Sequence, residues 1–138
     1  MPQPPELVRD SDNPARQPFQ ASVEIKLPPG TEGQNGFVAV PAGKRLVIEY
    51  ASGEAFLPTG QKGLLSVLTI VNGAKTYTRH HLATVTIGNF GAPAYFLAGQ
   101  VVRLYADAGN TVMLRADRDA PTGDGLARLS ISGYLVDL

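Results

Sequence analysis

The sequence predicts an all-β protein, an antiparallel β-sandwich of jelly-roll type with about eight or nine strands. Three observations predict this fold. Runs of alternating apolar and polar residues recur along the chain, glycine- and proline-containing turns separate them at regular intervals, and no segment shows the 3.6-residue period of a helix. Short strands at such spacing are typical of sandwiches and barrels, and a jelly roll of two four-stranded sheets fits their number best.

The chain has the size of one domain. Its 138 residues can bury a hydrophobic core without disulfides, and 43% apolar with 17% charged residues is typical of a globular protein. We therefore expect a single β-sandwich domain over residues 18–138. Residues 1–18 hold five of the eleven prolines, so residues 1–17 are predicted to form a proline-rich extended arm. A disordered tail and an arm that packs on a neighbouring subunit both fit this composition.

The first strands have the clearest patterns. Residues 19–27 alternate strictly, which predicts a strand with one buried face. Residues 44–50 follow a Pro-Ala-Gly turn and alternate in the same way. Because side chains of a strand point to alternate faces, Leu46, Ile48 and Tyr50 are expected to share one face.

The middle of the chain contains the strongest hairpin signal. Residues 64–71 are apolar on both faces except at Ser66 and Thr69, which predicts a strand that is covered on both faces. Asn72 and Gly73 follow, and both tolerate the positive φ of a tight turn. Residues 75–87 are therefore predicted to form one strand that runs antiparallel to residues 64–71.

The C-terminal third is predicted to hold four more strands. These strands cover residues 94–98, 101–106, 111–116 and 126–138. The Asp-Ala-Gly-Asn turn after residue 106 predicts a hairpin between the second and third of them. The last strand is expected to bend, if at all, at Gly133.

Charge and composition exclude several classes of function. Twelve basic and twelve acidic residues leave no net charge, and no run of lysine or arginine supplies the basic surface on which nucleic-acid binding depends. No apolar run approaches the ~20 residues of a membrane-spanning helix. The absence of cysteine excludes disulfides, thiolate metal sites and cysteine nucleophiles.

Four segments of strand and turn residues together carry a resemblance to known proteins. They are NPARQPF (13–19), VPAGKRLVIEY (40–50), VRLYAD (102–107) and SISGYLVDL (130–138). Together they resemble small exported bacterial proteins of unassigned function that are predicted to be β-sandwiches. The resemblance implies export across the inner membrane, to the periplasm or the medium, although residues 1–10 lack the pattern of a secretory signal. It implies nothing about chemistry.

Residues 117–125, DRDAPTGDG, form the candidate metal site. Calcium binds carboxylate and carbonyl oxygens of flexible loops, and Asp117, Asp119 and Asp124 could supply three carboxylates. Arg118 competes as a counter-ion, and the same residue types are the commonest turn formers. A calcium site and an ordinary turn therefore stay open as alternatives. No other cofactor is expected.

Tyr95 and Phe96 form the candidate ligand-binding patch. They are adjacent aromatics in a segment flanked by glycine and proline, which predicts an exposed surface on which a sugar could stack. The alternative is that these rings fill the core between the sheets. For a hydrolase, Glu49 and Glu54 are candidates by residue type alone.

These observations favour a non-enzymatic β-sandwich module that acts by surface binding or self-assembly. Unpaired strand edges and a proline-rich arm make self-association the first expected interaction. The alternative is a carbohydrate-binding domain, with or without calcium, whose partner is a glycan. A carboxylate-based hydrolase has the least support. Neither nucleic acid nor a membrane span is expected.

Overall fold

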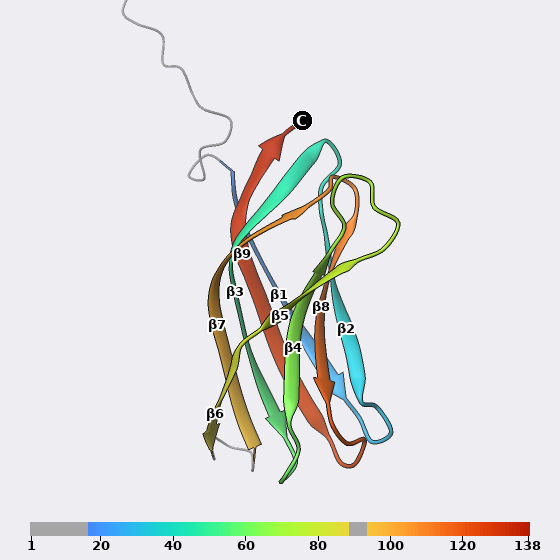
Figure 1. Ribbon diagram of the computed structural model, residues 1–138, viewed down its shortest axis with the longest axis vertical. Coiled ribbons are helices and arrows are strands. Elements are labelled where there is room, and N and C mark those ends of the chain that lie inside the picture. Colours follow the sequence, from blue (N-terminus) through green and yellow to red (C-terminus); the bar gives the residue numbers. More distant parts are fainter. Residues whose placement is uncertain (1–16, 89–93) are drawn as a thin grey trace, which may run out of the picture.

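The computed structural model of the protein describes residues 17–88 and 94–138, which consist of β-strands and their connections (Figure 1). The predicted arm lies outside the described residues except for Gln17. The strands of the described part are β1 (Pro18–Leu27), β2 (Gly33–Ala39), β3 (Lys44–Leu57), β4 (Gly63–Thr69), β5 (Thr78–Leu82), β6 (Thr84–Gly88), β7 (Ala94–Ala106), β8 (Thr111–Arg118) and β9 (Gly125–Asp137).

The strands form two antiparallel sheets that pack face to face. One sheet has the order β1-β9-β3-β7-β6, and the other has the order β2-β8-β4-β5. Strands from the two ends of the chain pair in a nested series, β1 with β9, β2 with β8 and β3 with β7. This is the topology of a jelly roll, so the predicted fold class is confirmed. The first sheet has five strands instead of four because β6 is added to its edge.

The core lies between the sheets and follows the predicted alternation. Ile25 and Leu27 at the end of β1 are almost completely buried, and so are Leu46 and Ile48 of β3. Their burial confirms the inward faces predicted for residues 19–27 and for the start of residues 44–50. Strand β8 contributes Val112, Leu114 and Ala116, which alternate along it, to the same core.

Strand β3 changes face in its middle, which corrects the prediction for Tyr50. The register of β3 shifts between Ile48 and Tyr50 against both neighbouring strands. The irregularity reverses the parity of the strand, so that Tyr50 points outward and is 43% exposed. Gly133 of β9 lies opposite Ile48, and a Cβ there would overlap the carbonyl oxygen of Val47. The glycine therefore permits the close approach of backbones at this point.

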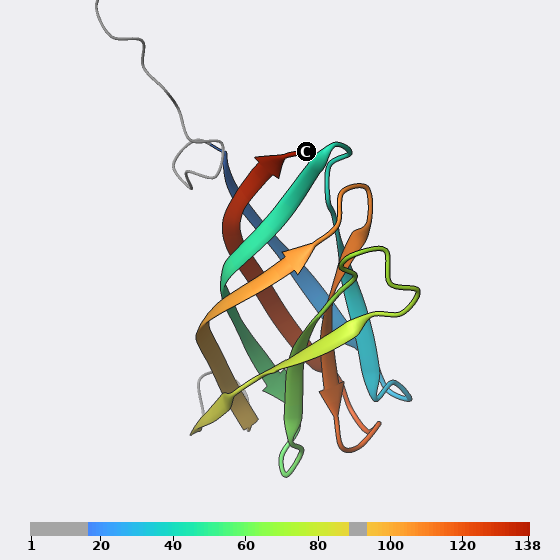
Figure 2. The same cartoon turned by 45° about the horizontal axis from the view of Figure 1, so that its top comes forward.

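The single strand predicted for residues 75–87 is wrong, because the chain changes sheet within it. Strand β5 pairs with β4 in the four-stranded sheet, and β6 pairs with β7 in the five-stranded sheet. Figure 2 shows this yellow-green segment crossing from one sheet to the other. Asn72 and Gly73 do adopt positive φ, but the hairpin loop is longer than these two residues, since the first pair is Thr69 with Thr78.

The hairpin predicted for residues 101–116 is also wrong. The segments at 94–98 and 101–106 form one continuous strand, β7, in the five-stranded sheet. Strand β8 lies in the opposite sheet, so the turn after Ala106 carries the chain across the sandwich. Local turn chemistry is the same for a hairpin and for a crossing between sheets, and the sequence pattern does not separate the two.

Candidate functional site

The register of the five-stranded sheet aligns small side chains on its outer face. Ser22 of β1 pairs with Ser130 of β9, Ser130 also pairs with Ser52 of β3, and Ser52 pairs with Gly99 of β7. We call these three serines, together with Gly99 at the end of the line, the serine row. The row crosses four neighbouring strands at right angles to their direction. The Oγ atoms of Ser52 and Ser130 are 2.9 Å apart and share a hydrogen bond.

On one side of the serine row lie three ion-paired residues, Glu24, Arg128 and Glu54, which we call the charged row. Arg128 of β9 lies between Glu24 of β1 and Glu54 of β3. Its Nε is 3.3 Å from a Glu24 carboxylate oxygen, and its Nη1 is 3.2 Å from Glu54 Oε1. The hydrogen bond to Glu54 contributes most to raising the pKa of Arg128 above its ordinary value. The guanidinium is thus held in place by carboxylates on both neighbouring strands.

The other side of the serine row is uncharged. It consists of Gln20, Ser132 and Tyr50, which are paired across β1, β9 and β3. Tyr50 extends over the neighbouring strand, because a Cβ added to Gly99 would lie 2.6 Å from the Tyr50 hydroxyl oxygen. The missing side chain at position 99 therefore makes room for the tyrosine.

The serine row lies in a shallow transverse groove between the charged row and the side chains of Gln20 and Tyr50. Two adjoining hollows of about 510 Å³ and 290 Å³ share Ser22, Ser52 and Ser130 in their linings. The larger hollow extends to Gln20 and Tyr50. The smaller one extends to the charged row and to Leu97 of β7. Hydroxyl and amide groups and one aromatic ring are prominent in the larger hollow, whereas charged and apolar residues line much of the smaller one.

The predicted patch at Tyr95 and Phe96 is corrected in part. Phe96 points inward and is only 7% exposed, so it belongs to the core. Tyr95 points outward and stacks on Phe56, with ring centroids 4.6 Å apart. Its hydroxyl donates a 2.6 Å hydrogen bond to Glu54, and this bond raises the pKa of the Tyr95 phenol. Tyr95 therefore supports the charged row from beyond the groove.

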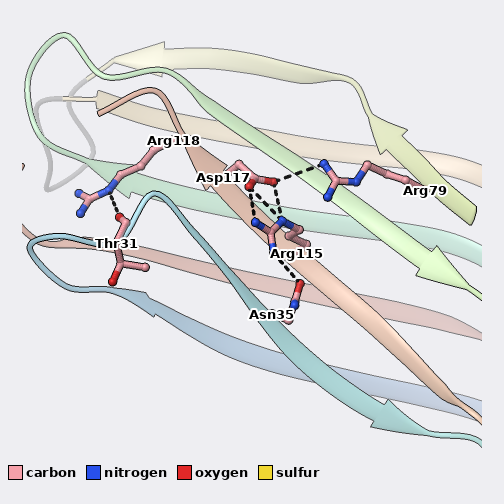
Figure 3. A network of polar contacts seen from close by, with 6 residues as sticks. All are labelled: Thr31, Asn35, Arg79, Arg115, Asp117 and Arg118. Carbon is pink, nitrogen blue, oxygen red and sulfur yellow. Dashed lines mark hydrogen bonds and ion pairs between the residues drawn. The ribbon is translucent and has the colours of Figure 1, made fainter. Parts of the chain in front are cut away.

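The three aspartates of the predicted metal site have separate surroundings. Asp117 lies at the end of β8, where Arg115 donates a 2.9 Å hydrogen bond to it and Arg79 Nη1 lies 3.8 Å from its Oδ2 (Figure 3). Asp119 accepts a 2.8 Å hydrogen bond from the backbone amide of Lys62. Asp124 is exposed.

Arg118 fills the space inside the predicted metal loop. Its side chain is 4% exposed and points to the face of β8 opposite Asp117. The guanidinium donates hydrogen bonds to five backbone carbonyls and one side-chain oxygen, which belong to Pro28, Thr31, Pro121, Thr122, Gly123 and Gln61. The loop carbonyls that calcium would need are therefore turned toward an arginine. Over residues 17–88 and 94–138, no three metal-ligating side chains come together.

The carboxylates proposed for a hydrolase lie apart on one strand. Glu49 and Glu54 are five residues apart on β3, which is about 16 Å along an extended chain. Glycosidase carboxylates lie within about 10 Å of each other. Glu54 is also engaged by Arg128 and Tyr95. The pair predicted from residue type does not form a common site.

The transverse groove was not predicted from the sequence. Each serine of the row lies at a polar position of an alternating strand. The pattern therefore predicts only that its side chain is exposed to solvent. The groove arises because three strands distant in sequence place these positions in one register. The only local signal is Gly99, a glycine inside a strand pattern, which often marks a close approach.

No family model matches the chain, and no curated protein matches it. Within the part of the chain that the structure describes, there is no helix of the length and apolar character needed to cross a membrane.

Proposed function

We propose that the protein is a non-enzymatic binding module that holds an uncharged glycan in the transverse groove. The observation that supports this function is the serine row, a line of hydroxyl groups across three strands that continues to Gly99. Hydroxyls both donate and accept hydrogen bonds, and so match the hydroxyls of a sugar. Tyr50 adds an exposed ring beside the row, and the apolar face of a sugar can pack on such a ring.

The charges of the groove favour an uncharged ligand. Arg128 is already paired with Glu24 and Glu54, so an acidic sugar would have to compete with two carboxylates for the guanidinium. A neutral glycan needs no such exchange. We also propose that the protein is exported, as the resemblance to exported bacterial proteins implies, which would bring the groove into contact with extracellular glycans.

The first test is affinity electrophoresis through gels that contain one soluble polysaccharide each. Glucomannan, galactomannan, xylan, mixed-linkage β-glucan and dextran represent the neutral class, and polygalacturonate represents the acidic class. We expect retardation by at least one neutral polymer and none by polygalacturonate. Retardation by no polymer would contradict the proposed function, and retardation by polygalacturonate alone would contradict the neutral class.

Variants connect the binding to the groove. Removing the ring in Tyr50→Ala is expected to weaken binding about tenfold, which corresponds to ~1.4 kcal/mol. The matched control is Phe37→Ala, because Phe37 is 63% exposed on the outer face of the other sheet. Equal effects of the two substitutions would show that the ligand does not bind in the groove.

A second candidate function is self-association at the margin formed by β6 and β7. Val85 on β6 is 61% exposed and Val101 on β7 is 82% exposed, and β6 is the outermost strand of its sheet. Exposed apolar side chains beside an unpaired strand edge favour pairing with another chain. Sedimentation equilibrium of the wild type and of Val85→Asp tests this function. A monomer at all concentrations would exclude it.

A further inference from the structure

The loop between β4 and β5 begins with a tight turn at residues 71–74, which we call the Asn-Gly turn. Among the residues that the structure describes, Asn72 is the only one other than glycine with a positive φ, at 59°, and Gly73 follows at 68°. The amide of Ala74 donates a 3.2 Å hydrogen bond to the carbonyl of Val71 and closes the turn. Asn72 and Gly73 are both exposed to solvent.

An asparagine followed by glycine is prone to deamidation, because glycine has no side chain to obstruct attack by its own backbone nitrogen. The nitrogen of Gly73 would attack Cγ of Asn72 and form a cyclic imide. The side-chain nitrogen of Asn72 takes up the proton of the attacking amide and leaves as ammonia. Water then opens the ring at either carbonyl and gives aspartate or isoaspartate, so the reaction needs no reactant other than water.

The closed turn keeps the two reacting atoms of this step apart. For a residue that has a Cβ, a φ near 59° belongs to the left-handed region, in which ψ is about +47°. At that ψ the nitrogen of the next residue lies nearly opposite Cβ across the Cα–C bond. Rotation about this bond has to bring Cγ of Asn72 toward the nitrogen of Gly73, so deamidation requires the turn to open.

Asp107, the first residue after β7, holds the Asn-Gly turn closed. Its carboxylate accepts a 2.8 Å hydrogen bond from the amide of Gly73 and a 3.0 Å hydrogen bond from the amide of Asn72. The first of these bonds engages the attacking nitrogen itself. The backbone amide of Asp107 also donates a 2.9 Å hydrogen bond to the carbonyl of Ile70, which fixes the carboxylate beside the turn.

We infer that Asn72 is a site of spontaneous deamidation and that the Asp107 carboxylate sets its rate by holding the turn closed. This inference is independent of the groove and of the proposed function. The rate in the native protein follows the population in which the turn is open. Loss of two hydrogen bonds to a charged acceptor should raise this population about tenfold or more. Either product adds a carboxylate to the turn, where it repels Asp107 and weakens the contact between the two loops.

Deamidation of the folded protein during incubation at neutral pH tests the inference. Trypsin releases Asn72 within residues 63–75 and the second Asn-Gly pair, at Asn35, within residues 27–44. Mass spectrometry of the two peptides measures each conversion in the same sample. Arg115 donates a hydrogen bond to the side chain of Asn35, and the pairing of β2 with β8 holds its backbone, so Asn35 serves as an internal reference.

We expect Asn72 to deamidate about tenfold faster in Asp107→Ala than in the wild type, with Asn35 unchanged. The matched control is Asp119→Ala, because Asp119 also accepts a hydrogen bond from a loop amide, that of Lys62, in another loop. It should leave both rates unchanged. Equal rates at Asn72 in Asp107→Ala and wild type would overturn the inference. Equal acceleration at Asn72 and Asn35 would also overturn it, since general unfolding would then be the cause.

The wild type alone gives a second readout that does not depend on folding of a variant. Deamidation of Asn72 should be at least about tenfold slower in the native protein than in urea, where the turn is absent. The amide of Gly73 should also be protected from hydrogen exchange, because it donates to Asp107. Equal deamidation rates in the native and the urea-unfolded protein would show that the carboxylate does not hold the turn closed.

Discussion

The side chain of Tyr50 on β3 extends over Gly99 on the neighbouring strand β7. A Cβ at position 99 would lie 2.6 Å from the Tyr50 hydroxyl oxygen but at an ordinary 3.6 Å from the ring carbon that bears it. The conflict is thus confined to the terminal atom of a partly exposed side chain. The position of the ring at the groove therefore depends on the absence of a side chain on β7.

The first prediction concerns this pair. Gly99→Ala should move the Tyr50 ring and weaken glycan binding several-fold, while the thermal midpoint changes little, because the ring can rotate toward solvent. Tyr50→Phe removes the conflicting oxygen, so adding Gly99→Ala to Tyr50→Phe should cost little further affinity. Titration calorimetry of the two single variants and the double variant measures this coupling. Additive effects would show that the two residues act independently.

The second prediction concerns the buried arginine. Arg118→Met removes the donor for five backbone carbonyls, and the unfolding free energy should fall by at least about 3 kcal/mol because buried acceptors lose their partners. Urea unfolding measures this loss. Arg103→Met is the control, since Arg103 is exposed on β7 and its replacement should change stability by less than ~0.5 kcal/mol. Similar values for the two variants would disprove the structural role of Arg118.

The third prediction concerns Asp107, which joins two loops. The amides of Gly73 and Asn72 donate hydrogen bonds of 2.8 and 3.0 Å to its carboxylate and hold the pKa of Asp107 below its ordinary value. A lowered pKa means that the carboxylate stabilises the fold above the ordinary value of 3.8, and that this contribution is lost as pH falls through the lowered pKa.

Asp107→Asn should therefore lower stability by about 1 kcal/mol near neutral pH and by progressively less below pH ~4. Thermal unfolding of both proteins between pH 7 and pH 2 gives the comparison. The control is Asp124→Asn, because Asp124 is exposed in its loop. A constant difference between wild type and Asp107→Asn over the whole pH range would refute the argument.

The fourth prediction concerns calcium. The loop carbonyls bond to Arg118, and Asp117 and Asp119 have partners of their own, so unfolding curves in EDTA and in millimolar calcium should coincide. A ligand at a hundred times its dissociation constant would stabilise the native state by about 2.7 kcal/mol. A rise of several degrees that is lost in Asp119→Ala would restore the calcium site.

Patterns within single strands could be predicted from the sequence, whereas relations between strands could not. The alternation of residues 19–27 was sufficient to place Ile25 and Leu27 in the core. Tyr50 was assigned to the wrong face because a one-residue irregularity leaves no mark in the hydrophobic pattern but reverses every later position. The change of sheet after Leu82 was missed for a similar reason. Residues 75–87 have the pattern of one half-buried strand, although they contain both β5 and most of β6.

The candidate site was harder to predict than the fold. Phe96 and Tyr95 are equally aromatic, and only the phase of β7 decides that one is buried and the other is not. Arg118 was read as a counter-ion of the aspartates beside it in sequence. On a strand, however, neighbours point to opposite faces, and the burial of an arginine is decided by which carbonyls the loops bring to it.

The nested pairing of the strands has a consequence for synthesis of the chain on the ribosome. Strand β1 is made first, yet its partner β9 begins only at Gly125. At ordinary rates of translation, roughly ten seconds separate the appearance of the two strands. During this interval the apolar side of β1 has no sheet to join. Any other nascent chain with a complementary strand then competes with β9, so crowded polysomes are where misassembly of this protein would begin.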